Sequence, residues 1–409
     1  MDQVRITRNR PSFLTGISRN VIILGFVSLF QDASSEMLYP VVPMFLTTVL
    51  GAPMTVVGLI EGFAEFTASI LKAVFGRLSD RFQRRRVFVS LGYGLSTLSR
   101  PLLLVAKIWG IVLAARIIDR LGKGVRTSPR DALLAASAPA EHRGKVFGLH
   151  RAMDTIGAVV GPLLAIGLLA ISNNDYRFVF LIAIIPTVLA FLLTFAVKEA
   201  QAIGTLQIPK KETPPHSPSA ARHWSLTTVH RPPAYWKFLA INTIFFIGNS
   251  SAVFLILRAK DLGLSAALAI LAYVVYNLAY ALLSTPAGML SDRLGRYRVL
   301  QLGFLIFAVV YAGFALSSAA WLIWPLFVLY GFYAAMTEGI SKAAIADLVT
   351  PEHLGSAIGL FYMATGLAML IASSLAGWLW KEFGAPVTFG VSATMATLAA
   401  LIIGGDKRK

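Results

Sequence analysis

One segment of the chain concentrates residue types that could do chemistry inside a membrane. It lies between apolar stretches, and at about 100° per residue its polar side chains fall within roughly 140° of a helix circumference. They are Arg116, Asp119, Arg120, Lys123, Arg126, Thr127, Arg130 and Asp131. A cation at the bilayer centre costs at least ~3 kcal/mol, so this stripe must line an aqueous cavity or meet carboxylates.

The alternative is a helix that ends near Leu121 and is followed by a cytosolic loop. From Trp109 to Leu121 such a helix would rise only ~20 Å, against a hydrocarbon layer of ~30 Å. A continuous helix that carries the whole stripe is therefore predicted.

Four carboxylates in two earlier apolar runs are candidate proton carriers. Asp32 and Glu36 are spaced i, i+4, as are Glu61 and Glu65, so each pair shares one helix face. At a rise of ~1.5 Å per residue, Asp32, Glu65 and Arg120 are expected to meet near the midplane. Burial, the like charge of Glu36 and a nearby cation all influence the proton affinity of Asp32. We therefore expect Asp32 to be the first candidate for coupling transport to protons, and Glu36 the second. Glu61 and Glu65 compete for this role, and structural ion pairing is the alternative for all four.

Candidate solute-binding residues are spread over both halves of the chain. Depth estimates place Arg151 and Asp154 nearer Lys123 and Arg126 than the midplane group. The second half offers mostly neutral groups, and ordinary packing or interfacial anchoring is the alternative for its tyrosines. We expect charge handling in the first half and shape recognition in the second. The substrate-binding prediction comprises Arg116, Arg120, Lys123, Arg126, Arg151, Asp154, Asn249, Tyr273, Asn277 and Glu338.

Composition indicates a polytopic membrane protein. The 409 residues are 56% hydrophobic and only 14% charged. The net charge of +17 comes from cations clustered between apolar runs, which encodes membrane topology and does not indicate nucleic-acid binding. The chain has no cysteine, and His150 is the one histidine within a helix core, so no metal or other cofactor is expected. Asp32 and Glu36 interrupt the first apolar run and no small-residue cleavage site follows it, so a retained first span is predicted instead of a signal peptide.

The apolar windows predict twelve membrane helices. They fall near residues 20–47, 53–77, 86–106, 108–134, 145–171, 175–197, 235–259, 265–290, 297–317, 321–348, 353–379 and 385–404. The predicted organisation is a six-helix half at 1–197, a polar linker at 198–234 and a second six-helix half at 235–409. Basic residues gather on the side of both termini and the linker, so the positive-inside rule places these in the cytoplasm.

Two motifs repeat between the halves at nearly one offset. Gly76-Arg-Leu-Ser-Asp80-Arg81-Phe-Gln-Arg84 recurs 212 residues later as Gly288-Met-Leu-Ser-Asp292-Arg293-Leu-Gly-Arg296. Pro139-Ala-Glu-His-Arg-Gly144 recurs 211 residues later as Thr350-Pro-Glu-His-Leu-Gly355. A duplicated six-helix unit around a central site is typical of alternating-access transporters.

The repeated loop resembles the signature loop of the major facilitator superfamily, and this resemblance covers essentially the whole chain. It implies an all-α fold of twelve transmembrane helices in two pseudo-symmetric halves, with helices 1, 2, 4 and 5 of the first half facing the cavity. It also implies that the loops latch the halves in the outward-facing state, through Gly76, Asp80, Arg81, Gly288, Asp292 and Arg293. Gln83 departs from the glycine that the motif usually has there.

A second motif, Gly157-Ala-Val-Val-Gly161-Pro162, is similar to one that the family associates with antiporters. Ala165 stands where a further glycine is expected, and small residues four apart also let any two membrane helices pack closely.

These observations predict a secondary active transporter of a small organic solute in a bacterial inner membrane. Proton-coupled export by antiport is the first expectation, and a proton-coupled importer of an anionic or zwitterionic metabolite is the alternative. An intramembrane enzyme would need a nucleophile with its base or a metal cluster, and a channel would not need duplicated halves. The expected partners are the solute, protons and the lipid bilayer, without nucleic acid, and the protein is expected to be a monomer.

Overall fold

A computed structural model describes residues 17–82, 84–137, 143–199, 232–349 and 351–405. Within the first and last turns of three helices it leaves the side chains of residues 73, 76, 77, 79–82, 143–145, 148 and 351–356 undescribed. The side chains of Gly76, Asp80 and Arg81 therefore lie outside the described residues, as does nearly all of the predicted linker.

The described chain is all helical. The first half contains α1 (Arg19–Leu38), α2 (Val41–Thr48), α3 (Met54–Phe82), α4 (Arg85–Leu104), α5 (Trp109–Ala136), α6 (Arg143–Ile171) and α7 (Tyr176–Thr194). The second contains α8 (Pro233–Gly248), α9 (Val253–Asp261), α10 (Ala266–Leu294), α11 (Arg296–Leu316), the 3-10 turn η2 (Ala320–Leu322), α12 (Ile323–Leu348), α13 (Pro351–Phe383) and α14 (Ala385–Gly404).

These helices confirm the predicted twelve-span architecture. Within the described residues, eleven segments are long and apolar enough to cross a membrane. The twelfth span is α5, which is 28 residues long but carries the charged stripe. The alternative of a helix that ends near Leu121 is wrong, because α5 continues to Ala136 with Pro129 inside it.

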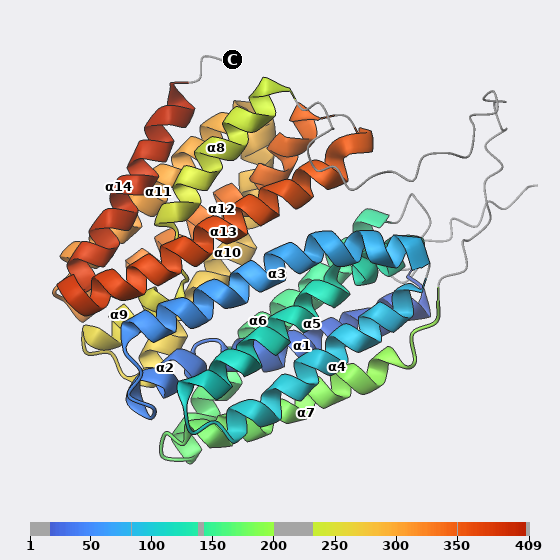
Figure 1. Cartoon of the computed structure of the whole chain (residues 1–409), viewed down its shortest axis with the longest axis horizontal. Helices are drawn as coiled ribbons and strands as arrows, with labels where there is room; N and C mark the ends of the chain where they lie inside the picture. Colours follow the sequence, from blue (N-terminus) through green and yellow to red (C-terminus); the bar gives the residue numbers. More distant parts are fainter. Residues whose placement is uncertain (1–16, 83, 138–142, 200–231, 350, 406–409) are drawn as a thin grey trace, which may run out of the picture.

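The two six-helix halves lie side by side, and α3 and α13 run along each other where they meet (Figure 1). We call the end at which α1 and α8 begin and α7 and α14 end the terminal end, and the opposite end the distal end. Glycines allow close approach toward the distal end. A Cβ on Gly58 of α3 would lie 2.1 Å from the carbonyl oxygen of Ser373, and one on Gly377 of α13 would lie 2.3 Å from that of Met54.

Two predicted single helices are each broken. The window 20–47 forms α1 and α2, separated at Tyr39 and Pro40, and the window 235–259 forms α8 and α9, separated at residues 249–252. Pro40 cannot donate a backbone hydrogen bond, which accounts for the first break. The second break is rich in side chains that compete for backbone hydrogen bonds, Asn249, Ser250 and Ser251. The breaks occupy equivalent positions in the two repeats.

The predicted glycine motif of α6 packs directly against α1. A Cβ on Gly157 would lie 2.5 Å from the Leu29 carbonyl oxygen and 3.1 Å from the Asp32 Cβ, and one on Gly161 would lie 2.4 Å from the Ala33 carbonyl oxygen. The motif therefore brings the α6 backbone against the turn of α1 that carries Asp32.

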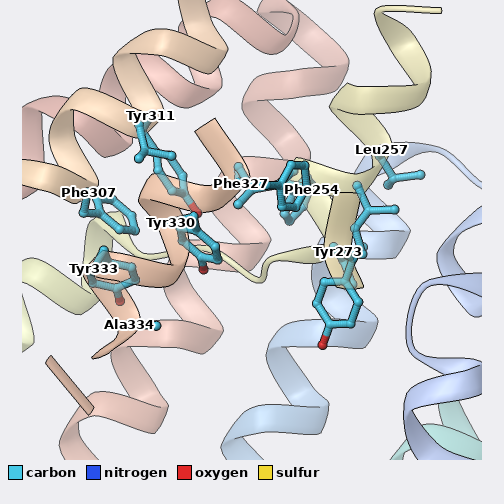
Figure 2. Close-up of a cluster of buried hydrophobic side chains, with 14 of the residues drawn as sticks. Phe254, Leu257, Tyr273, Phe307, Tyr311, Phe327, Tyr330, Tyr333 and Ala334 are labelled. Atoms are coloured by element: carbon cyan, nitrogen blue, oxygen red, sulfur yellow. The ribbon is translucent and has the colours of Figure 1, made fainter. Parts of the chain in front are cut away.

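Aromatic packing fills the interior of the second half. Figure 2 shows Phe307, Tyr311, Tyr330 and Tyr333 gathered within it, with Tyr273 to one side of this group. The rings of Phe307 and Tyr311 stack with centroids 3.9 Å apart. Tyr273 also packs against a ring, because its centroid lies 5.2 Å from that of Tyr39 in the first half.

Two distal arginines cap helix ends. Arg177 donates hydrogen bonds of 2.8 Å to the carbonyl oxygens of Leu104 and Ala106, just at the end of α4. Arg258 donates in the same way, at 2.9 Å, to the Ser317 carbonyl oxygen at the end of α11. The distal cations therefore have structural partners that explain their position.

Candidate functional site

A two-rung ladder of ion pairs joins the parallel helices α3 and α5. Arg116 Nη2 lies 2.6 Å from Glu61 Oε1, and one turn further Arg120 Nη2 lies 3.1 Å from Glu65 Oε1. The two glutamates are four residues apart on α3, and the two arginines are four residues apart on α5. Each spacing is about one helical turn, so the second ion pair forms one turn after the first. The predicted pairing of Arg120 with Glu65 is thus formed, and the first rung is almost completely buried.

Asp32 is not a member of this ladder, although Asp32 and Arg120 line the same small cavity. The charged residues that act most strongly on Asp32 are Asp154, Lys123, Arg130 and Arg126. The physical reason is rotation, since α1 turns Asp32 toward α6, against which it packs closely at Gly157. Depth along a helix was estimated correctly for the α3–α5 ladder but does not determine which neighbour a side chain faces.

The rest of the stripe on α5 is divided among several helices. Asp119 lies 3.0 Å from Arg100 Nη1 of α4. Arg126 donates to the Ser96 hydroxyl at 2.5 Å and lies 4.6 Å from the Tyr93 ring centroid. Because both groups are on α4, Arg126 is held between α5 and α4 rather than presented to the other half.

Arg151 and Asp154, predicted at a depth nearer Lys123 and Arg126, face two different neighbours. Asp154 Oδ2 lies 3.5 Å from His150 Nδ1, one turn away on α6. Arg151 donates to the Tyr280 hydroxyl of the second half at 3.2 Å. The two residues are three positions apart on α6, and this rotation directs them to different neighbours.

A buried network closes the distal end between the halves. The Ser251 hydroxyl, in the break between α8 and α9, lies 3.2 Å from Glu61 Oε2, to which it donates, and 3.3 Å from the Tyr39 hydroxyl. The backbone N–H of Ser251 donates to the Ser373 hydroxyl at 3.2 Å. The first rung of the ladder is therefore linked to the second half through one serine. We call Tyr39, Glu61, Arg116, Ser251 and Ser373 the distal network.

Sequence reasoning missed Tyr39 and Ser251, although the repeat contained a signal. The two residues are 212 positions apart, which is the offset of the repeated loop motif. Equivalent positions of a two-fold repeat can touch only near the pseudo-symmetry axis. The breaks in the two helices thus meet each other at this axis.

Glu36 contacts the second half directly. The Tyr273 hydroxyl of α10 donates a hydrogen bond of 2.9 Å to Glu36 Oε2. Among the described residues neither Glu36 nor Asp32 has a cation within 4.0 Å, in contrast to Glu61 and Glu65. The predicted division of labour between the halves is therefore too simple, because a tyrosine of the second half binds a carboxylate of the first.

A small polar cavity connects these carboxylates with the ladder. It is lined by Asp32, Ser35, Glu36, Leu38, Tyr39, Val42, Arg100, Leu103, Ala115, Arg116, Asp119, Arg120, Lys123 and Arg126. Its volume is about 30 Å³, which suits one or two water molecules. The Nε atoms of Arg116 and Arg120 are buried without a protein partner, so water bound here has donors to accept from.

The remaining candidates lie in the second half. Asn249 donates to the Tyr333 hydroxyl at 2.8 Å, while the side-chain nitrogen of Asn277 is buried without a hydrogen-bond partner. Glu338 accepts a bond of 2.7 Å from the Tyr280 hydroxyl. Tyr280 therefore lies between Arg151 of the first half and Glu338 of the second.

The second copy of the loop motif makes contacts within its own half. Asp292 pairs with Arg296, and Arg296 Nε lies 3.4 Å from Asp347 of α12. A Cβ on Gly288 would meet nothing within 4 Å, and Arg293 is exposed. Within the described part of the chain, these residues make no contact with the first half in this conformation.

Comparison with known proteins agrees with this architecture. The Major Facilitator Superfamily model matches residues 24–257 and 238–406. An uncharacterized MFS-type transporter of Methanocaldococcus jannaschii is 35% identical over 393 residues, covering 95% of this chain and 94% of the relative. A class C tetracycline resistance protein of Escherichia coli is 24% identical, covering 86% of each chain.

Solved structures show the same fold at low identity. A POT family transporter in complex with a thioalcohol-conjugated peptide has a TM-score of 0.77 at 14% identity, covering 94% of this chain and 95% of that one. The nucleoside transporter NupG has a TM-score of 0.73 at 14% identity, covering 96% and 100%. With its duplicated halves, its charged central helix and these matches, the chain belongs to the major facilitator superfamily and is a multi-pass membrane transporter of a solute, not an enzyme.

Proposed function

We propose that this transporter couples solute movement to protons, and that Glu36 and Asp32 carry the proton. The observation that carries this proposal is the 2.9 Å contact between Glu36 and Tyr273, because it crosses from one half to the other. A carboxylate whose hydrogen-bond donor moves away with the other half has a proton affinity that depends on conformation. That dependence is what proton coupling requires.

The other carboxylates are better suited to holding helices together. Glu61 and Glu65 each have an arginine partner on α5, so their charges are balanced locally. Removing one partner of a buried pair is strongly unfavourable, which makes protonation of Glu61 a poor routine step. The geometry therefore supports Glu36 ahead of Asp32, reversing the order expected from the sequence.

Alternating access would proceed by opening the distal network. In this structure the halves meet there through Ser251 and through the close backbone contact at Gly58. The positive-inside rule makes the terminal end cytoplasmic, so in a bacterial inner membrane this network would be the periplasmic gate. The small cavity gives Asp32 and Glu36 a hydrated place close to that gate.

Export by antiport is the mode that the sequence favours, and the relative named for tetracycline resistance is compatible with it. One observation favours symport instead. Lys123 lines the same small cavity as Asp32 and Glu36. Protonation of the carboxylates would free Lys123 for an anion, and solute and proton would then bind together.

The test uses purified protein in weakly buffered detergent solution and a ligand found by thermal-shift screening of metabolites and drugs. Proton release on ligand addition indicates antiport, and proton uptake indicates symport. We expect Glu36→Gln to bind the ligand without proton exchange and to lose gradient-driven transport in proteoliposomes.

Tyr273→Phe removes only the donor to Glu36, and we expect it to shift the pH dependence of transport. Tyr330→Phe is the matched control, because Tyr330 lies in the aromatic core. Gradient-driven transport with normal pH dependence in Glu36→Gln and Asp32→Asn would refute the proposal.

A further inference from the structure

We propose that Lys72 and Lys342 bind the carboxylate or phosphate of an organic anion between the two halves. This inference rests on the proposed function in one respect, namely that the solute binds between halves that separate. It names the class of solute that the sequence leaves open.

Lys72 and Lys342 lack the carboxylate partner that four of the nearby arginines have. The arginines with a carboxylate within 4.0 Å include Arg100, Arg116, Arg120 and Arg130. Within the described ranges, Lys72 and Lys342 have no carboxylate at that distance. An unpaired cation within membrane-spanning helices is costly, so two such lysines near one ring indicate a place for an exchangeable anion.

The two lysines approach the same aromatic ring from opposite halves. Lys72 Nζ of α3 lies 5.4 Å from the centroid of the Tyr362 ring of α13, and Lys342 Nζ of α12 lies 5.8 Å from it. The ring attracts each ammonium group modestly but does not neutralise either charge. An anion beside Tyr362 would touch both lysines and remove their mutual repulsion.

The surroundings of Lys72 are strongly positive. The charges that act most on it are Lys123, Glu65, Arg120 and Lys342. Glu65 is the one carboxylate among them, and it already pairs with Arg120 at 3.1 Å.

The carboxylate of Glu338 does not change this balance. It lies one turn before Lys342 on α12, but it accepts the hydroxyl of Tyr280 at 2.7 Å instead of pairing with the lysine. Among the described side chains, no carboxylate therefore pairs with Lys72 or Lys342.

An anion bound between Lys72 and Lys342 would also affect the conformation of the transporter. Lys72 lies about 27 Å along α3 from its distal start, at a rise of ~1.5 Å per residue, so it is on the terminal side of the distal network. An anion that bridges Lys72 and Lys342 would hold α3 and α12 together at that side. Closure toward the terminal end would then be favoured by the solute itself, which is how binding can drive alternation between states.

The test compares matched ligands that differ in charge. Phenyl phosphate and benzoate carry the anion, and benzamide is the neutral counterpart of benzoate. We expect the two anions to raise the melting temperature of the detergent-purified protein, and benzamide to have no effect. In Lys72→Gln and Lys342→Gln the half-saturating concentration of phenyl phosphate should rise at least about tenfold, since each variant loses a charged hydrogen bond.

Lys107→Gln is the charge-matched control, because Lys107 is exposed in the distal loop between α4 and α5. Lys72→Arg should keep most of the affinity, which separates loss of charge from misfolding. Equal stabilisation by benzamide, or unchanged affinity in both glutamine variants, would overturn the proposal.

A lipid headgroup is the other source of the same anionic chemistry. Phosphatidylglycerol in nanodiscs, compared with phosphatidylcholine, should not displace phenyl phosphate if the site serves a soluble anion, and displacement would overturn that assignment. Glu36→Gln should still bind phenyl phosphate. Anion binding without proton exchange in the wild type would refute the proposed coupling and leave this site standing.

Discussion

Ser251→Ala is the sharpest test of how the halves are held at the distal end. Its hydroxyl donates to Glu61 at 3.2 Å and lies 3.3 Å from the Tyr39 hydroxyl, and both contacts cross between the halves. A buried hydrogen bond to a charged group contributes about 1.5–3 kcal/mol. If that bond exists only while the distal end is closed, its loss raises the ratio of open to closed molecules about 10- to 100-fold.

The assay uses the absence of native cysteine. Val42 of α2 is 1% exposed in the closed arrangement, and α2 packs against α9 of the other half. A single cysteine at Val42 should react slowly with a maleimide in detergent solution. In the Ser251→Ala background its rate should rise in proportion to the open fraction, by the same 10- to 100-fold factor.

Ser317→Ala is the matched control. Ser317 is also a buried distal serine, but its hydroxyl donates to the Gly313 carbonyl oxygen of its own half. We expect no change in labelling from this variant. Equal labelling rates in Ser251→Ala and Ser317→Ala would refute the view that Ser251 holds the gate closed.

Three further predictions follow from the packing and charge pattern. Gly161→Ala should lower the melting temperature, because its Cβ would lie 2.4 Å from a carbonyl oxygen of α1. Gly167→Ala has nothing within 4 Å of its Cβ and should be neutral or stabilising by up to ~1 kcal/mol. Equal effects of the two variants on the melting temperature would contradict this prediction. Arg120→Ala should abolish transport in a folded protein, because it leaves Glu65 unpaired. Arg120→Lys should retain part of the transport activity, because Arg120 makes a single N–O contact of 3.1 Å with Glu65. Full transport by the alanine variant would show that the pair is dispensable. An impermeant thiol reagent should label a cysteine at Gly51 but not one at Ala220 in intact cells, and the opposite pattern would invert the proposed orientation.

The twelve spans could be predicted because their signal is local. Apolar windows of membrane length need no knowledge of the partner helix, and the same holds for the charged α5, whose stripe already excluded a short helix. The breaks at Tyr39–Pro40 and at Asn249–Ala252 were missed, because each lies in a segment that contains an 18-residue window with a mean hydropathy typical of a membrane span, 1.4 for the first and 1.8 for the second. Reading Pro40 as a helix terminator would have found the first break.

The candidate site was predictable in composition but not in pairing. The i, i+4 spacing showed that Glu61 and Glu65 share one helix face, and the depth estimate put Glu65 level with Arg120. Neither showed that Arg100 would take Asp119, because that pairing depends on how α4 is rotated against α5. Ionisable residues were therefore found correctly in the membrane, while their neighbours were assigned only in part.

A duplicated twelve-helix membrane protein with charges concentrated in the first half could be inferred without any structure. Hydropathy, charge position and the offset of 212 are properties of the chain alone. Only the tertiary structure decided which carboxylates are paired with arginines and which, like Glu36, contact the other half. The reason is that a helical period fixes which residues share a face, whereas the packing of small residues such as Gly157 against α1 sets which faces meet.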